Sequence, residues 1–338
     1  MSSHDRLAHL RGMKAVVIGD VMLDRYIWGD TRRISPEAPV PVIEVQRESY
    51  TAGGAANVAL NLASIQIDVV VCGAFGSDAP GAMLTQLLAE RGVLLPADCA
   101  SADRPTIVKT RVMVQRQQHC RIDIENAPVA YGLEDPRSRE CVLSAIQRAQ
   151  FLILSDYAKG VLTQSLVDQV TEIAIRENKV IAWDPKPGNR LIPRGVTVLT
   201  PNRSEAYQLA GLPEPRLGEP FHVDEIGKII FARYQPRYLV VTLGAEGMML
   251  YRDADHKTHL PTMAREVFDV SGAGDTVIAV LAAGLAAGWE LDEAATFANA
   301  AAGIVVGKLG TATASVEELA AALTPKEDFI HGIARKSA

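Results

Sequence analysis

Short apolar segments rich in β-branched residues alternate with segments of helical periodicity along most of this 338-residue chain. The strand-like segments are 15–18, 68–72, 151–155, 180–183, 196–199 and 238–242, and the helical segments are 54–65, 81–91, 163–177 and 204–210. This alternation is typical of a parallel sheet covered by helices on both faces. We therefore expect an α/β fold with a doubly wound, mostly parallel sheet, whose ligands bind beyond the carboxyl ends of the strands.

Two regions interrupt this alternation. Residues 39–45 alternate apolar and polar side chains after a proline-rich start, and residues 107–114 and 120–124 read as two strands joined around 115–119. The pattern predicts a small antiparallel sheet inserted among the βα units, which would serve as a lid over the site. Edge strands of the main sheet are the alternative interpretation.

Composition and charge restrict the class of protein. Apolar residues make up 48% of the chain, which is enough for a large core, and the net charge of −6 argues against nucleic acid or an acidic membrane surface as a partner. Residues 1–14 lack the apolar stretch of a secretory signal, and the longest apolar run, 277–288, is too short to span a bilayer. We therefore expect a cytoplasmic protein. The four cysteines, Cys72, Cys99, Cys120 and Cys141, have no metal-ligand spacing and are expected to be free thiols.

The segment 269–276, with the sequence Asp-Val-Ser-Gly-Ala-Gly-Asp-Thr, is the most informative motif. It opens a helical run of small residues. Gly272 and Gly274 allow a tight turn that points several backbone N–H groups the same way, and the positive end of the helix dipole adds to this anion site. Asp275 places a carboxylate beside it, and the chemical task that fits is accepting a proton from a hydroxyl that attacks a phosphoryl group. An ordinary helix start with an acidic first turn is the alternative.

Two further motifs lie near the N-terminus. Gly53, Gly54 and Asn57 open the first clear helix, where small residues let a ligand approach the backbone and Asn57 offers a donor and an acceptor to a sugar hydroxyl. Asp20 and Asp24 follow the first strand and are candidates for binding a polyol. The alternatives are a purely steric helix start for the glycines, and a metal site or solvated carboxylates for the two acids.

Two motifs of the C-terminal half suggest a nucleotide. Asn202 and Glu205 follow a strand and begin a helix, so they form either a capping box or a site near hydrated Mg²⁺ and phosphates. Thr242, Gly244 and Gly247 form a turn at a strand end, suited to a nucleotide or to a simple hairpin. The chain contains no GxGxxG, GxxxxGK[ST], GxSxG or HExxH, so any ATP would have to use the Gly272–Gly274 anion site.

Taken in order and spacing, these motifs resemble the ribokinase-like (PfkB) family of carbohydrate kinases over residues 14–323. The resemblance implies a ribokinase-like kinase domain over residues 12–325, with lid strands contributed by about 30–50 and 105–125. Within the family, segments 19–26, 33–42, 108–111, 155–160, 184–186 and 299–303 resemble the heptose 7-phosphate kinases. Their reaction is the ATP-dependent phosphorylation of D-glycero-β-D-manno-heptose 7-phosphate at C1, on the route to ADP-heptose and the lipopolysaccharide core.

The resemblance also implies a role for individual residues. Asp275 is the catalytic base, and the amides of Gly272, Ala273 and Gly274 stabilise the transferring phosphoryl group. The implied sugar-binding residues are Asp24, Gly53, Gly54, Asn57, Lys109, Arg111, Asp184 and Lys186, and the nucleotide-binding residues are Asn202, Glu205, Thr242, Gly244, Gly247 and Asn299. Glu205 would hold Mg²⁺ through water, and Asp269 would help to hold a monovalent cation such as K⁺. For the 7-phosphate of the sugar the candidate cations are Lys109, Arg111, Arg121, Lys159 and Lys186.

Three further expectations follow. The chain is expected to be a stand-alone kinase that acts on a sugar phosphate and ATP, and lid strands with unpaired edges favour a homodimer formed through the lid. Another sugar or nucleoside kinase of the same fold is one alternative. A catalytically silent ligand-binding protein on the same scaffold is the other.

Overall fold

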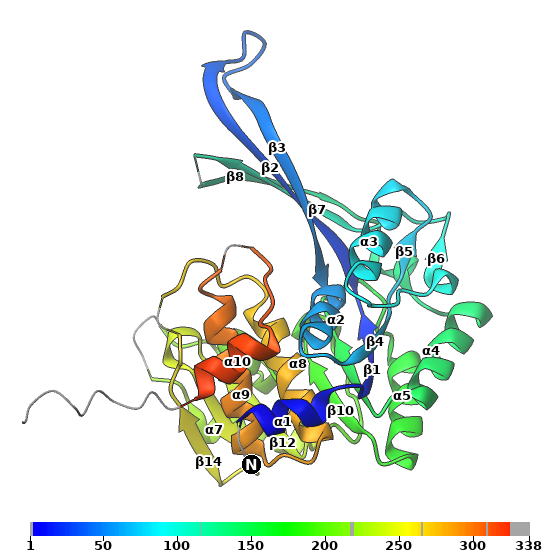
Figure 1. Cartoon of the computed structure of the whole chain (residues 1–338), viewed down its shortest axis with the longest axis vertical. Helices are drawn as coiled ribbons and strands as arrows, with labels where there is room; N and C mark the ends of the chain where they lie inside the picture. Colours follow the sequence, from blue (N-terminus) through cyan, green and yellow to red (C-terminus); the bar gives the residue numbers. More distant parts are fainter. Residues whose placement is uncertain (1–2, 116, 217–219, 265, 309, 325–338) are drawn as a thin grey trace, which may run out of the picture.

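The computed structural model describes residues 3–324 except 116, 217–219, 265 and 309. The expected C-terminal bound of the kinase domain, residue 325, lies outside the described residues. Figure 1 shows a body of sheet and helices, from which an arm of long strands projects. None of the helices in the described part of the chain combines the length and apolar composition that a bilayer crossing requires.

The body is built on an eight-stranded sheet with the order β14-β13-β12-β11-β10-β9-β1-β4. Its strands are β1 (Lys14–Gly19), β4 (Asp68–Cys72), β9 (Phe151–Ser155), β10 (Val180–Asp184), β11 (Val198–Leu199), β12 (Tyr238–Thr242), β13 (Met248–Tyr251) and β14 (Lys257–Leu260). The strands from β4 to β12 pair in parallel, and only β13 and β14 at one edge are antiparallel. The α/β, mostly parallel fold predicted from the alternation is therefore confirmed.

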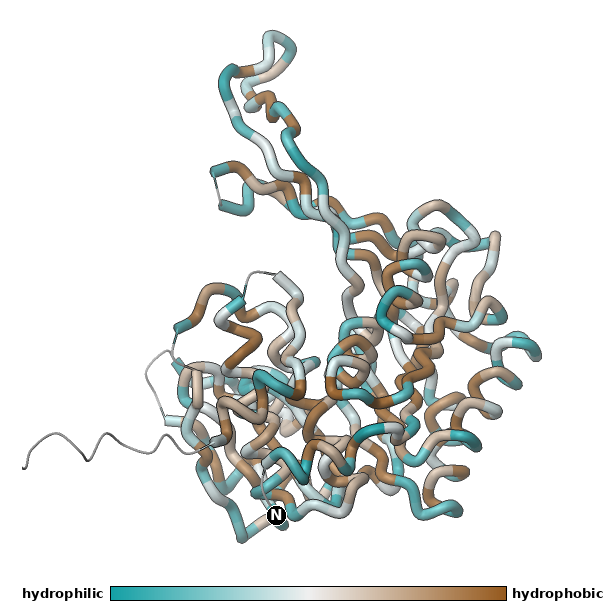
Figure 2. The backbone as a smooth tube through the Cα atoms, viewed as in Figure 1, coloured by the Kyte–Doolittle hydropathy of each residue, from teal (hydrophilic) through white to brown (hydrophobic). Residues whose placement is uncertain are grey.

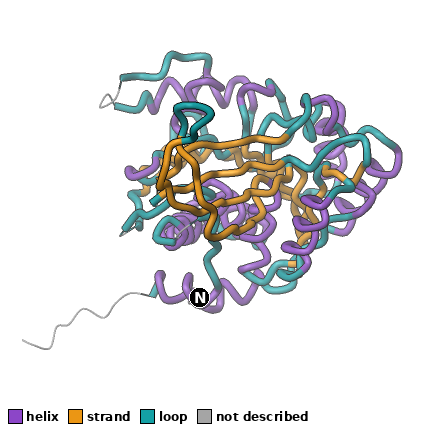
Figure 3. Tube along the Cα trace, turned by 90° about the horizontal axis from the view of Figure 1, so that it is seen from above, coloured by secondary structure: helices purple, strands orange, loops and turns teal. Residues whose placement is uncertain are grey.

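Helices lie on both sides of this sheet, as Figure 3 shows from above. They are α1 (Ser3–Leu10), α2 (Ala55–Ser64), α3 (Ala79–Ala89), α4 (Pro136–Arg148), α5 (Gln164–Arg176), α6 (Arg203–Ala210), α7 (Val223–Tyr234), α8 (Ala273–Ala286), α9 (Leu291–Val305) and α10 (Val316–Leu323), with 3-10 turns η1 (Ala97–Cys99), η2 (Pro128–Tyr131), η3 (Pro187–Asn189) and η4 (Gly244–Glu246). Helix α8 is buried along most of its length between α2, α9 and strands β9 and β10. Its run of alanines and glycines allows this close packing on all sides.

The arm is a second sheet with the order β3-β2-β7-β8, here called the lid. Its strands are β2 (Val21–Ile34), β3 (Pro41–Gly54), β7 (Val108–Val114) and β8 (Gln117–Ile124). The extra sheet is confirmed as a separate sheet rather than an edge of the main one, but it is mixed, because β2 and β7 pair in parallel. Hydrophobic and hydrophilic segments alternate along it in Figure 2.

Three local features were not anticipated from the sequence. Strand β2 begins directly after Asp20, so Asp24 lies within a lid strand rather than in a loop. A short pair of strands, β5 (Phe75–Gly76) and β6 (Ala100–Ser101), was not anticipated. Val267 and Phe268, which are strand-like in sequence, lie outside any strand and are largely exposed.

Candidate active site

A cavity of about 220 Å³ lies where parallel strands of the main sheet end. It is lined by Asp156, Tyr157, Asp184, Pro185, Lys186, Thr200, Asn202, Glu205, Thr242, Gly272, Gly274 and Asp275. Asp184 and Thr242 are the last residues of β10 and β12, and Asp156 follows β9 directly. The cavity therefore lies beyond the carboxyl ends of the parallel strands, where a ligand site was expected.

Asp275 reaches this cavity from the first turn of α8 and is almost completely buried. Its Oδ2 accepts a hydrogen bond of 2.7 Å from Nδ2 of Asn57, and its Oδ1 accepts one of 2.7 Å from the Tyr157 hydroxyl. Burial raises the pKa of Asp275 to about 6, while these two hydrogen bonds act in the opposite direction. A carboxylate with this pKa is suited to general base catalysis near neutral pH.

Gly272 sets the geometry at the start of α8. It precedes the helix with a left-handed backbone of φ +79°, and a Cβ at this position would lie 2.7 Å from Nδ2 of Asn57. A side chain at this position would therefore displace the residue that holds Asp275. The amide oxygen of Asn57, Oδ1, is buried and has no hydrogen-bond partner among the described residues.

The amides expected to form the anion site lie in this first turn. Gly272 and Gly274 line the cavity, and the first N–H groups of a helix have no partner within it. Ala273 differs, because its N–H donates to the Val270 carbonyl at 3.3 Å. The helix start therefore offers donors and the positive end of its dipole to an anion in the cavity.

Opposite α8, the cavity is strongly acidic. Burial, together with the nearby Glu205 and Asp275 carboxylates, raises the pKa of Asp184 well above its ordinary value. Burial also raises the pKa of Asp156 to about 7, and the nearby Asp20 carboxylate adds to this. Lys186 is the cation beside them, and its Nζ lies 3.0 Å from Oε1 of Glu205.

Mg²⁺ fits this arrangement. The crowded carboxylates supply oxygen donors and an excess of negative charge, both of which favour a hard divalent cation. Among the described residues, no three acidic, histidine or cysteine side chains converge as a ready-made metal site. Mg²⁺ keeps several waters and takes few protein ligands, so Asp184 and Glu205 on one side suffice when phosphate oxygens supply the other.

Asn202 and Glu205 form the capping box that was the alternative interpretation. Asn202 Oδ1 accepts from the Glu205 N–H at 2.9 Å, and Glu205 Oε2 accepts from the Asn202 N–H at 3.0 Å. Both residues also line the cavity, so the cap fixes the Glu205 carboxylate at the site. Its other oxygen accepts from Lys186.

Three residues expected at the nucleotide lie outside the cavity lining. Gly244 begins the turn η4, and a Cβ at this position would have nothing within 4 Å. A Cβ at Gly247 would lie 2.2 Å from the Leu260 carbonyl oxygen, so strand pairing explains this glycine. Asn299 is buried in α9 and donates to the Pro261 carbonyl at 2.7 Å, which anchors the segment following β14.

Asp269 caps the loop that precedes α8. Its Oδ1 accepts from the Ser271 N–H at 2.9 Å, and its Oδ2 accepts from the Gly310 N–H at 3.1 Å. The side chain therefore holds two segments of the chain together. A part in binding K⁺ stays a prediction.

The inner face of the lid carries most of the expected sugar residues. Cross-strand neighbours share a face, and the registers align Asp24 with Lys109 and Tyr26 with Arg111. Asp24 is buried, forms an ion pair with Arg111, and contributes to the raised pKa of Asp275, so this face is turned toward the Asp275 carboxylate. Gly53 is close beneath it, since a Cβ there would lie 2.3 Å from Oδ2 of Asp24. The adjoining Gly54 ends β3 and forms the N-cap of α2.

The other candidate cations for the sugar phosphate, two on the lid and one in the loop after β9, are already paired with carboxylates. Lys109 Nζ lies 3.2 Å from Asp123 and 3.8 Å from Glu125, and Lys159 Nζ lies 2.6 Å from Glu125. Arg121 pairs with Asp123 as well. Lys109, Lys159 and Arg121 thus form one network around two acids, apart from Lys186 in the cavity.

Two residues of the site were missed in the sequence, and one was misjudged. Tyr157 and Asp156 were quoted only as part of a longer motif, yet both line the cavity. The sequence could have indicated both residues, because they directly follow a buried strand, where ligand-binding residues of this fold class lie. Asp20 is fully buried and accepts from the N–H groups of Tyr157, Lys159 and Val161, so it anchors the loop after β9 and is not available to a polyol.

Comparison with known proteins identifies a family whose sequence model matches most of the chain. Residues 13–319 match the model of the pfkB family carbohydrate kinases. The bifunctional protein HldE of Haemophilus influenzae is 42% identical over 335 residues, covering 96% of this chain and 67% of that protein. HldE of Vibrio vulnificus is 44% identical over 330 residues, covering 96% and 66%. The chain thus spans about two thirds of the length of these relatives.

Solved structures resemble the fold. The ribokinase of Arabidopsis thaliana, complexed with ribose and ATP, superimposes with a TM-score of 0.72 at 21% identity, covering 92% of this chain and 98% of that one. Phosphofructokinase-2 of Escherichia coli, in complex with potassium, has a TM-score of 0.72 at 18% identity, covering 91% and 97%. The ribokinase-like architecture expected from the sequence is therefore confirmed.

Proposed function

The chain belongs to the pfkB family of carbohydrate kinases, and on this basis we propose that it transfers the γ-phosphoryl group of ATP to C1 of D-glycero-β-D-manno-heptose 7-phosphate. The product, heptose 1,7-bisphosphate, leads to ADP-heptose and the lipopolysaccharide core. One observation carries the chemistry: a buried carboxylate, Asp275, stands beside the amides at the start of α8, in a cavity at the ends of the strands. The heptose substrate rests on the motifs that resemble the heptose 7-phosphate kinases.

Asp275 accepts the proton of the attacking hydroxyl. Its pKa of about 6 leaves it ionised at neutral pH, and the bonds from Asn57 and Tyr157 hold both of its oxygens in place. The amides of Gly272 and Gly274 are oriented toward the charge of the transferring phosphoryl group, where preorganised donors are most effective. These residues deprotonate the acceptor and stabilise the phosphoryl group from the same turn of chain.

The sugar lies between Asn57 and the inner face of the lid. The unpartnered Oδ1 of Asn57 is an acceptor for a sugar hydroxyl, and Asp24 is a second one. The 7-phosphate binds Lys109 and Arg111. It replaces Asp123 as the partner of Lys109 and Asp24 as the partner of Arg111. The network of lid cations favours a phosphorylated sugar over a nucleoside.

ATP occupies the acidic side of the cavity together with Mg²⁺. Asn202, Glu205 and Thr242 line this side, and Lys186 supplies a positive charge to the phosphates. Mg²⁺ held by Glu205 through water, and near Asp184, would neutralise phosphate charge during transfer. Gly244, Gly247 and Asn299 shape the nucleotide end, and Asp269 contributes to a K⁺ site. The protein acts in the cytoplasm as a homodimer joined through its lids.

The test measures ADP release from Mg-ATP with four acceptors: the heptose 7-phosphate, fructose 6-phosphate, ribose and adenosine. We expect turnover with the heptose 7-phosphate at a kcat/KM far above that of the others. Preference for another acceptor would keep the kinase chemistry and reject the heptose substrate. ADP release with none of them would count against the proposed substrate class.

Replacing the base tests the chemistry separately. Asp275→Asn should lower kcat by roughly 10²–10⁴-fold or more, the typical size of a general base effect, with little change in ATP affinity. Titration with ATP by calorimetry provides the control for nucleotide binding. Near-normal kcat in this variant would exclude Asp275 as the base.

A further inference from the structure

Three thiols from three different elements of the fold lie close together. Cys72 ends β4, Cys99 ends η1, and Cys141 lies within α4. Helix α4 packs against both η1 and β4, and the three thiols lie near enough to one another that each shifts the pKa of the others. None of the three lines the active-site cavity.

Backbone packing brings these thiols together. Ser138, three residues before Cys141 and so on the same face of α4, donates its hydroxyl to the Asp98 carbonyl at 2.7 Å. Asp98 is the neighbour of Cys99 in η1. The contact between α4 and η1 is therefore held by an independent hydrogen bond one turn away from Cys141.

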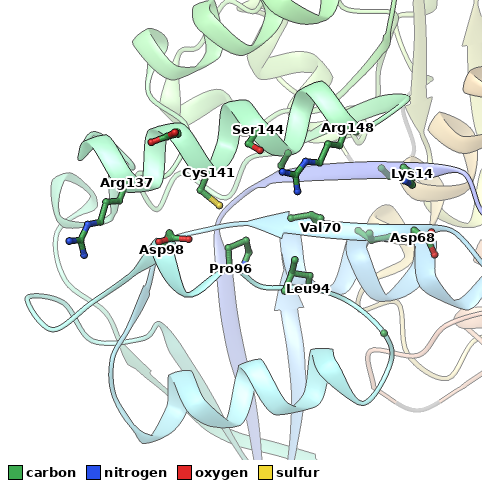
Figure 4. A pocket seen from close by; sticks show the side chains of 16 residues that line it. Lys14, Asp68, Val70, Leu94, Pro96, Asp98, Arg137, Cys141, Ser144 and Arg148 are labelled. Atoms are coloured by element: carbon green, nitrogen blue, oxygen red, sulfur yellow. The ribbon is translucent and has the colours of Figure 1, made fainter.

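Only one of the three thiols is accessible. Cys72 and Cys99 are buried, whereas Cys141 is half-buried and lines a cavity of about 660 Å³ between α4 and strands β1 and β4. Figure 4 shows its sulfur pointing from α4 toward β4 and the Pro96 segment, with Arg148 farther along the same helix. A small water-soluble reagent can thus reach Cys141, while the two partner thiols are shielded.

The surroundings favour a thiolate at Cys141. Hydrogen bonds from the thiols of Cys72 and Cys99, together with the charge of Arg148, lower its pKa well below the ordinary value. The same contact raises the pKa of Cys99. Because the thiolate is the nucleophile, Cys141 combines exposure with reactivity.

We propose that Cys141 is a peroxide-reactive thiol that forms a disulfide with Cys99. In the first step the Cys141 thiolate attacks one oxygen of hydrogen peroxide, the O–O bond breaks, and the departing hydroxide takes up a proton to become water. In the second step the Cys99 sulfur attacks the sulfur of the resulting sulfenic acid, the S–O bond breaks, and a second water leaves with the Cys99 proton. Two thiols are oxidised and one peroxide is reduced to two waters.

Cys99 is chosen as the partner because its backbone belongs to no paired strand of the main sheet, whereas that of Cys72 does. Cys72 is held in the sheet opposite Ile18 of β1, where a shift would break strand pairing. Cys99 ends a single 3-10 turn. The narrow geometry of a disulfide requires the thiols to adjust, and the turn adjusts more easily than the strand.

The direct test uses the wild-type protein. It is treated with hydrogen peroxide in native buffer, its remaining thiols are alkylated, and it is digested without reductant for mass spectrometry. We expect a linked peptide pair containing Cys99 and Cys141 that disappears with dithiothreitol. A link from Cys141 to Cys72, or Cys141 left reduced while Cys120 is oxidised, would contradict the proposal.

Variants separate the two steps. In Cys99→Ser the sulfenic acid at Cys141 should persist and be trapped by dimedone, and in Cys141→Ser the thiol of Cys99 should stay reduced. Cys120→Ser, which removes the exposed thiol of lid strand β8, is the matched control and should form the link as the wild type does. Oxidation of Cys99 in the absence of Cys141 would show that Cys141 does not initiate the reaction.

Discussion

At the scale of single residues, Asp275 shows how the protein adjusts one carboxylate. Burial raises the pKa of this group to about 6, while the hydrogen bonds from Asn57 and Tyr157 act to lower it. The balance leaves a base that is ionised near pH 7 and is more basic than an exposed aspartate. In the proposed reaction Tyr157 would therefore act through Asp275.

Removing the Tyr157 hydroxyl should shift the pH profile. Loss of a hydrogen bond to a charged group corresponds to a rise of about one pKa unit or more, so Tyr157→Phe should raise the pKa of Asp275. The base must be deprotonated, so the acidic limb of kcat/KM, near pH 6 in the wild type, should move to higher pH. The profiles of both enzymes are measured with the same substrates, so the ionisation of ATP is common to them.

The shape of the result distinguishes this role from a structural one. A positioning role predicts that the activity of Tyr157→Phe recovers toward the wild-type level at high pH. A uniform loss at every pH, with an unmoved acidic limb, would show that Tyr157 does not influence the ionisation of Asp275.

Asp275 should also cost stability. Its pKa rises from 3.8 to about 6 on folding, so the folded state binds more protons between these values, and stability falls as the pH rises through this window. The penalty is complete above pH 6 and corresponds to about 3 kcal/mol. Asp275→Asn should therefore raise the Tm at pH 8 and leave it close to the wild-type value near pH 4. Equal or lower Tm of the variant at pH 8 would contradict this.

At the scale of elements, the start of α8 depends on a glycine for two separate reasons. Gly272 has φ +79°, which strains any other residue, and it also packs against Asn57. Gly288 follows the other end of the same helix with φ +80° and nothing within 4 Å of a Cβ. A substitution would be strained by the left-handed backbone at both positions, but only at Gly272 would its Cβ also contact Asn57.

Alanine at each position should separate strain from function. Gly272→Ala and Gly288→Ala should each lose roughly 1–2 kcal/mol of stability from the left-handed backbone. Only Gly272→Ala should also lower kcat, by at least tenfold, because its Cβ displaces Asn57 and with it Asp275. Urea denaturation and initial-rate kinetics measure both quantities. A similar kcat in the two variants would reject the coupling through Asn57.

Element types were predictable from the sequence where one pattern dominated. The buried strands β9, β10 and β12 are continuous apolar runs, and each was placed to within a residue or two. Only the end of strand β2 was foreseen as part of the lid, because its first residues are apolar and continue the buried character of β1. Its partners β3 and β7 come from distant parts of the chain, and only pairing with them turns this segment out of the main sheet.

At the scale of the whole molecule, the lid leaves apolar side chains uncovered. Ile122 and Ile124 of β8 are 53% and 51% exposed, and the cross-strand register places them on the face opposite to Asp24. A second copy of the chain would cover them, together with the free edges of the sheet.

The dimer can be tested by mass. Light scattering at micromolar concentration should give twice the chain mass of 36.4 kDa. The double variant Ile122→Lys and Ile124→Lys should shift the protein toward monomer, because it places charge in an apolar contact. Val129→Lys, at a 91% exposed position in η2 and outside the lid, is the control and should remain dimeric. A monomeric wild type would refute the lid interface.

The sequence by itself determined the parallel sheet, the glycine-rich start of α8 and the position of Asp275 in it. Each of these depends on residues close together in the chain, through side-chain periodicity or backbone freedom. The tertiary structure decided which distant groups meet: Tyr157 and Asn57 on Asp275, Arg111 on Asp24, and the three thiols of Cys72, Cys99 and Cys141. Their partners lie in other elements, so no local pattern records them, and only the packing of helices and strands brings them together.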